Sequence, residues 1–221
     1  MTDQHALTGR RLTTPRAAAV AGLLFGVLFA TVIVLARTSL PQAGDGTLVV
    51  LADSARRLTL AAVLMPFAGI AFLWFLGVVR DRLGDLEDRF FASVMLGSGL
   101  LFLAMAFTAM ALAAGIVAVA SGTLDPTERV VAGFAHRVML QVSSVYALRM
   151  AAVFMISSGT IWLRTGLMPR WLVIGTYLLA LVLLFVVSFN LWVTLLFPAW
   201  VCLISVMILL TTLRHRPDPR G

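Results

Sequence analysis

Long apolar runs constrain the fold of this chain more than any other feature of its sequence. A transmembrane helix needs about 20 apolar residues to cross roughly 30 Å of hydrocarbon, and it satisfies its own backbone hydrogen bonds while doing so. The 221 residues are 61% hydrophobic and 12% charged, which is more apolar surface than a soluble core can bury. We therefore predict an all-α polytopic membrane protein, a bundle of six transmembrane helices. The predicted helices lie at 17–37, 59–80, 91–120, 138–163, 171–188 and 192–213.

The arginines predict how these helices are oriented. All 17 basic residues are arginine, and eleven of them fall on the side that holds both termini. Because basic loops stay in the cytoplasm, we expect a cytoplasmic N-terminal tail at 1–16, a transmembrane domain at 17–213 and a cytoplasmic C-terminal tail at 214–221. One arginine, Arg149, lies inside a span, and the others lie on the predicted outer side: Arg37, Arg56, Arg57, Arg129 and Arg137.

Two loops on the predicted outer side carry helix signals of their own. Asp125 offers a side-chain acceptor at an N-cap, Pro126 follows at N1, and Glu128 supplies a carboxylate at N3, which together indicate a helix start. The stretch from Gly46 to Arg57 mixes apolar and charged residues, as interfacial helices do. We therefore expect two short interfacial helices that lead into spans two and four.

Small residues recur at helical spacing along two of the spans, where they permit close approach of neighbouring backbones. Such stripes serve either the interior of a bundle or a face for a second copy or another membrane protein. We favour the interior for both spans, and keep a homodimer or membrane-complex interface through Gly22, Gly26, Ala111 and Gly115 as the alternative. The stripes are Ala18, Gly22, Gly26 and Ala30 in span one, and Ala104, Thr108, Ala111, Gly115, Ala118 and Gly122 in span three.

Arg149 is the residue that most directly suggests a function. It lies near the middle of span four, where a charged side chain costs about 3 kcal/mol or more unless it is paired or wetted. One interpretation makes Arg149 the wall of a cavity for an anionic ligand, and the other pairs it with Asp53, Asp125 or Glu128 from the outer loops. The candidate ligand-binding residues are Arg149, Tyr146, Gln141, Ser144, His136 and Arg137.

Several kinds of chemistry are disfavoured by what the sequence lacks. Without lysine there is no Schiff-base cofactor, and the lone Cys202 forms neither a disulfide nor a thiolate metal cage. Nucleotide-binding, hydrolase and metalloprotease motifs are absent. The arginines sit at span ends as topology signals rather than as a nucleic-acid surface. We therefore expect no enzyme activity, no cofactor, no metal and no nucleic-acid partner.

The predicted cytoplasmic loop after span two reads "GVVRDRLGDLEDRFF". Its residues Gly77, Asp81, Arg82 and Gly84 resemble the loop between helices two and three of the major facilitator transporters. That resemblance implies a latch in which the aspartate accepts hydrogen bonds at a helix N-terminus and the arginine pairs with an acid. The other interpretation is a solvated connector, because such loops need a glycine and charges in any membrane protein.

A further resemblance covers most of the chain. The segment "SGTIWLRTGLMPRWL" places Gly159, Arg164, Gly166, Pro169 and Arg170 in a pattern similar to that of an uncharacterised family of six-helix bacterial membrane proteins of the actinobacterial type. The resemblance implies a multi-pass protein of the bacterial inner (plasma) membrane. That family brings no established activity with it.

Two functions follow from these observations as hypotheses. The first is a small carrier or binding protein for an anionic or amphipathic ligand, held in a cavity near Arg149. The second is a non-transporting structural or accessory subunit of another membrane complex.

Overall fold

The computed structural model describes residues 14–39, 52–83, 89–120, 125–186 and 191–214. These ranges are almost entirely helical and contain no strand. The elements are α1 (Thr14–Ser39), α2 (Ala52–Leu83), α3 (Arg89–Ala120), α4 (Pro126–Gln141), the π-helix η2 (Val142–Ala147), α5 (Leu148–Thr165), α6 (Arg170–Phe185) and α7 (Leu191–Arg214). The all-α membrane-type fold expected from the apolar runs is confirmed at this level.

Within the described ranges, five helices are long and apolar enough to cross a membrane. One of them combines α4, η2 and α5 into a single apolar unit over Pro126–Thr165. The fifth of the six predicted spans is represented by α6, which has 16 residues. A helix of that length is about 24 Å long, which is shorter than the roughly 30 Å of a hydrocarbon core. That α6 crosses the membrane therefore stays a prediction.

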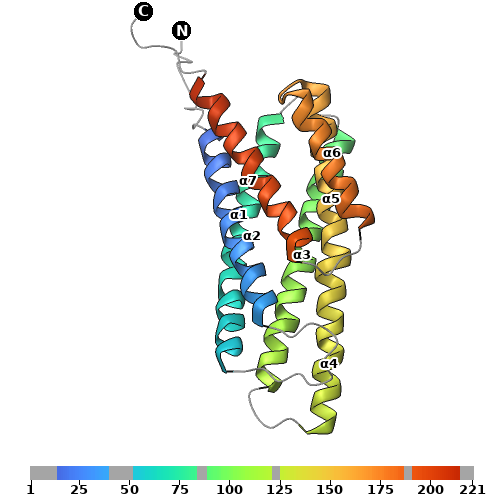
Figure 1. Cartoon of the computed structure of the whole chain (residues 1–221). Helices are drawn as coiled ribbons and strands as arrows, with labels where there is room; N and C mark the ends of the chain where they lie inside the picture. Colours follow the sequence, from blue (N-terminus) through green and yellow to red (C-terminus); the bar gives the residue numbers. More distant parts are fainter. Residues whose placement is uncertain (1–13, 40–51, 84–88, 121–124, 187–190, 215–221) are drawn as a thin grey trace, which may run out of the picture.

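The helices run roughly side by side, so the bundle has two distinct ends (Figure 1). At one end α1 begins and α7 ends, and at the other end α4 begins. We call these the termini end and the α4 end. The common end for the first and last helices agrees with the predicted even number of crossings, and which end faces the cytoplasm stays a prediction.

The two predicted outer helices are not separate elements within the described residues, and positions 46–51 of the first lie outside them. The residues after Ala52 form the first turns of α2, and those after Pro126 form the first turns of α4. The predicted start of α4 is confirmed, because Glu128 N donates to Asp125 Oδ1 at 2.8 Å and Asp125 N donates to Glu128 Oε2 at 3.0 Å. This capping box satisfies backbone donors that the first turn leaves without helical partners.

Aromatic rings fill the centre of the bundle. Phe72 of α2 is fully buried and has five ring neighbours. Its ring centroid lies 4.7 Å from that of Phe25 and 5.6 Å from that of Phe102. The other neighbours are Phe75, Phe154 and Phe197. These rings come from α1, α2, α3, α5 and α7, so one cluster ties five helices together.

The small-residue stripe of α1 packs inside the bundle, as favoured from the sequence. A Cβ atom added to Gly22 would lie 2.8 Å from Phe75 Cδ2 and would overlap Ser205 Oγ. One added to Gly26 would overlap Cys202 Sγ and lie 3.1 Å from the backbone oxygen of Pro198. The absence of side chains at these two glycines therefore lets α7 lie directly against α1.

For α3 the expected interior position of the stripe is wrong. Its described members are half-exposed or exposed, and a Cβ added to Gly115 meets no other atom within 4 Å. The reason is that α3 has a second face of small residues, on which Ala106, Ala109 and Ala113 are buried. That face already permits close packing inside the bundle, so the stripe with Ala111 and Gly115 points outward.

Two hydrogen bonds attach the short α6 to its neighbours. Trp200 Nε1 of α7 donates to Thr176 Oγ1 at 3.0 Å, and the hydroxyls of Thr160 on α5 and Tyr177 on α6 lie 2.8 Å apart. Trp200 and Thr176 are both buried. Helix α6 packs mainly against α5 and touches α7 little, so the hydrogen bond from Trp200 is a specific polar link between α6 and α7.

We expect Trp200→Phe and Thr176→Val to be coupled in a double-mutant cycle. Hydrogen bonds between helices in membrane proteins contribute about 0.6 kcal/mol on average and up to about 1.7 kcal/mol. The measurement is unfolding of the full chain in mixed detergent micelles for the two single variants and the double variant. Strictly additive losses would show that this hydrogen bond contributes nothing to stability.

Candidate functional site

The long helix from Pro126 to Thr165 changes its winding once, over Val142–Ala147, where it is a π-helix. Short π segments inside α-helices occur frequently at functional sites, because the wider turn redirects side chains. The segment contains Ser143 and Ser144, and Ser144 is 2% exposed. A buried hydroxyl is thus presented from the irregular turn.

Arg37 reaches this turn from another helix. It lies in the last turn of α1, and its Nη2 atom donates a hydrogen bond to Ser144 Oγ. The two residues are 107 positions apart in the sequence, and the guanidinium is half-buried. The contact therefore joins the end of α1 to the π-helical turn.

His136 completes the group from α4. It is 5% exposed, and Arg37 lies close enough to act on it electrostatically. His136 and Ser144 are eight residues apart on one long helix, which corresponds to about 12 Å along its axis. Arg37 contacts Ser144 directly, whereas its link to His136 is electrostatic. We call Arg37, His136 and Ser144 the Arg37 site.

The surroundings of the Arg37 site are apolar. Towards the α4 end, a cluster of buried side chains joins α2, α3 and α4. Ala36, the neighbour of Arg37, packs against this cluster, as do Ala135 and Val142 from the long helix. Charges interact more strongly in such surroundings than in water. An arginine, a histidine and a hydroxyl in this place offer hydrogen-bond donors that a carboxylate or phosphate can accept. The buried members of the cluster are Leu58, Ala109, Ala113, Ile116 and Met139.

Arg149 makes no hydrogen bond or ion pair with the Arg37 site among the described residues. It is half-buried on α5, five residues beyond Ser144, or about 7.5 Å along an ideal helix. Within the ranges that the structure describes, no hydrogen bond or ion pair of Arg149 is found. Glu128, one of its suggested partners, is engaged in the capping box. Arg149 therefore lies deeper in the bundle than the contact between Arg37 and Ser144.

The six residues predicted to bind a ligand separate into two groups. Ser144 and His136 meet in the Arg37 site. Tyr146, Gln141 and Arg137 are exposed on the outside of the long helix, and Arg149 is apart from both. Arg37 was not predicted as a site residue, because an arginine at the end of a span is usually a topology signal. The available signal was its place directly after the charge-free run from Ala17 to Ala36.

The residues of the predicted latch lie at the termini end of α2. Gly77 is an exposed position inside α2, which continues to Leu83. Asp81 and Arg82 are therefore helical positions rather than parts of a loop, and Gly84 lies outside the described residues. The latch itself stays a prediction.

No group of three or more histidine, cysteine, aspartate or glutamate side chains comes together as a metal site in the part of the chain that the structure describes. Comparisons with protein-family models, with curated proteins and with solved structures find no match. The family resemblance drawn from the sequence therefore stays a prediction.

Proposed function

We propose that this chain is a small carrier or binding protein that holds an anionic or amphipathic ligand at the Arg37 site. One observation carries the proposal: the guanidinium of Arg37 is bonded to a buried serine in a π-helical turn, beside a buried histidine. A guanidinium presents several N–H donors in a planar fork that matches carboxylate and phosphate oxygens. The ligand would share the donors of Arg37 with Ser144 and accept a further hydrogen bond from His136.

The site is better suited to an amphiphile than to a small hydrophilic ion. The guanidinium of Arg37 offsets the charge of an anion, while the cluster around Leu58 and Met139 offers apolar contact beside it. Removing charge from water is costly unless the charges are paired and hydrogen-bonded. An amphiphile with a negatively charged head and an apolar tail meets both requirements.

The predicted location, orientation and latch are consistent with this proposal. The protein lies in a bacterial inner membrane with both termini in the cytoplasm, so the Arg37 site belongs to the outer half of the bundle. The first turns of α2 and α4 lie at the outer interface. Arg149 is a second, deeper positive position on the path of the ligand, and Asp81 and Arg82 form the latch at the opposite end.

A second function is favoured by the outward stripe on α3. Ala111 and Gly115 are exposed, and small residues of this kind permit the close approach of another membrane helix. This observation supports the alternative of an accessory subunit that assembles through α3. Because Gly22 and Gly26 are occupied by α7 in this chain, any such interface would use α3 rather than α1.

The proposal is tested by binding of a defined anionic amphiphile. Dodecyl phosphate is added to the detergent-solubilised full chain, and bound molecules are counted by native mass spectrometry. We expect Arg37→Gln to weaken binding about tenfold or more, since hydrogen bonds to charged groups contribute about 1.5–3 kcal/mol. Arg137→Gln is the matched control, because it removes the same charge from an exposed neighbour of His136.

The outcomes separate the two functions. Equal binding by wild type and Arg37→Gln, with both variants folded by circular dichroism, would contradict the proposed ligand site. Dodecyltrimethylammonium binding as tightly as dodecyl phosphate would contradict its preference for anions. A protein partner that copurifies in fixed ratio from native membranes, and is lost on Gly115→Leu, would support the accessory subunit instead.

A further inference from the structure

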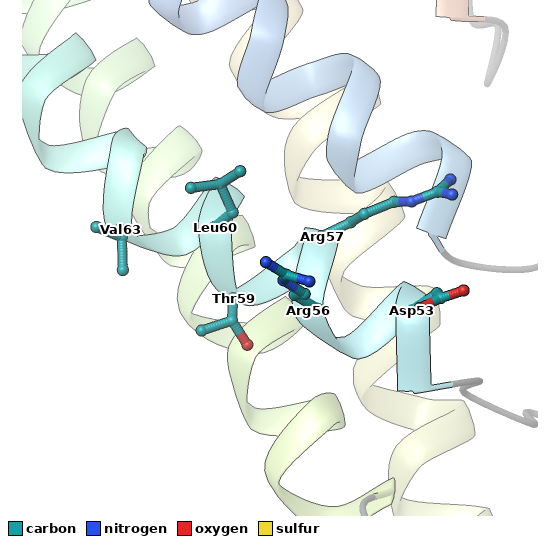
Figure 2. A pocket seen from close by; sticks show the side chains of 6 residues that line it. All are labelled: Asp53, Arg56, Arg57, Thr59, Leu60 and Val63. Atoms are coloured by element: carbon teal, nitrogen blue, oxygen red, sulfur yellow. The ribbon is translucent and has the colours of Figure 1, made fainter.

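The outer surface of α2 carries a second basic group that the Arg37 site does not use. Arg56 and Arg57 are exposed in the first turns of α2, where Asp53 is also exposed. Together with Thr59, Leu60 and Val63 they line an open hollow of about 890 Å³ (Figure 2). Its polar side chains lie toward the helix start and its apolar ones farther along α2. The hollow thus has one charged end and one apolar end.

The apolar end continues as a straight track along the helix. Residues spaced by four and three positions share one face of a helix, and six positions on that face of α2 are all exposed. The exposed fractions of Leu60, Val63 and Phe67 are 50%, 56% and 57%. The six residues are Arg56, Leu60, Val63, Phe67, Ile70 and Trp74.

The part of the track from Arg56 to Phe67 is about as long as one leaflet of a bilayer is thick. Half of a hydrocarbon core is about 15 Å thick, which corresponds to about ten residues of helix. Counted from Arg56, that distance ends near Phe67. An acyl chain whose phosphate lies at Arg56 and Arg57 would therefore contact Leu60, Val63 and Phe67 over its length.

The charges at the end of the track nearest the start of α2 favour an anion. Two arginines outnumber the single Asp53 in the hollow, and they lie at the start of a helix, where the backbone dipole is positive. Basic residues near a membrane surface attract anionic lipids with about 1 kcal/mol each. Exposed arginines beside an exposed apolar track distinguish a lipid from a soluble phosphate, which would gain nothing from Leu60, Val63 or Phe67.

We propose that this face of α2 is a binding site for one anionic glycerophospholipid, with its phosphate at Arg56 and Arg57 and an acyl chain along Leu60, Val63 and Phe67. The proposal does not depend on the proposed function. Asp53 limits the net charge of the hollow, and the hydroxyl of Thr59 donates to the backbone oxygen of Ala55 at 2.9 Å.

The test is competition between two lipids that differ only in the head group. Equimolar palmitoyl-oleoyl phosphatidylglycerol and phosphatidylcholine are added to the solubilised full chain, and the bound lipids are counted by native mass spectrometry. We expect wild type to prefer phosphatidylglycerol. The double variant Arg56→Gln, Arg57→Gln is expected to lower that preference about tenfold or more. Asp53→Asn is expected to raise it.

The control removes two exposed arginines from the termini end. The double variant Arg80→Gln, Arg170→Gln loses the same charge, and it is expected to keep the preference of wild type. An equal loss in this control would reduce the effect to general electrostatics and overturn the proposed site. The absence of any preference in wild type would also overturn it.

Two further arms identify the ligand and separate this proposal from the first one. Glycerol phosphate that displaces phosphatidylglycerol at equal concentration would show a soluble-anion site and overturn the lipid assignment. Arg37→Gln is expected to leave the phosphatidylglycerol preference unchanged, while the Arg56, Arg57 double variant keeps the Arg37-dependent binding of dodecyl phosphate. Because dodecyl phosphate also fits the α2 face, the loss caused by Arg37→Gln is measured in the Arg56→Gln, Arg57→Gln background, where each proposal can fail without the other.

Discussion

Phe72→Ala is expected to destabilise the protein by about 3–5 kcal/mol, the range for removing a buried phenylalanine ring from a packed core. The ring of Phe72 is fully buried, and its removal would leave five aromatic neighbours around a cavity. Those neighbours belong to five different helices, so no single helix can move to fill the space. The measurement is the free energy of unfolding in mixed micelles, followed by circular dichroism.

The matched control for this prediction lies on the same helix. Phe67 is 57% exposed, and Phe67→Ala removes the same ring from a position that faces outward. We expect a loss well below 1 kcal/mol, because exposed positions lack the packing that makes buried truncations costly. Equal losses for Phe67→Ala and Phe72→Ala would show that the aromatic cluster does not hold the bundle together.

The second large effect is expected from Gly26→Leu. A side chain at Gly26 would meet Cys202 and the backbone oxygen of Pro198 on α7, and backbone cannot give way as a flexible side chain can. Overpacking of a core typically costs about 1–3 kcal/mol, and we expect this variant at the upper end of that range. Cys202, the lone cysteine, reports directly on the contact, because separation of α7 from α1 would speed its labelling by an apolar maleimide.

Gly115→Leu provides the control for this substitution. A Cβ at Gly115 meets nothing within 4 Å, so the same change there is expected to preserve stability and the labelling rate of Cys202. Slow labelling of Cys202 in Gly26→Leu, together with an unchanged unfolding energy, would mean that α1 and α7 are not in direct contact at this position.

The positions of the helices could be predicted from the sequence because the bilayer sets them. Apolar length decides where a span can lie, and the runs at 91–120 and 192–213 nearly coincide with α3 and α7. The start of α4 was predictable for a different reason, since Asp125, Pro126 and Glu128 satisfy the first turn locally. Both signals reside within a few neighbouring residues.

The rotation of a helix about its axis depends on partners far away in the sequence. Helix α3 has small residues on two faces, and the choice of the face with Ala109 and Ala113 is made by the helices that pack against it. The Arg37 site has the same character. Arg37 and Ser144 form a contact only because α1 and the π-helical turn are side by side. No local sequence pattern predicts a π-helix.

The contact between α1 and α7 also has a consequence for biosynthesis. Helix α1 is packed by α7, and about 170 residues separate Gly26 from Pro198. At 5–20 residues per second, translation of that distance takes about 10–30 seconds. During that time the surface of α1 at Gly22 and Gly26 is not covered by α7 and faces lipid or the insertion machinery. A chain truncated before α7 would leave this surface of α1 unpacked. We expect membrane quality control to recognise that exposed surface.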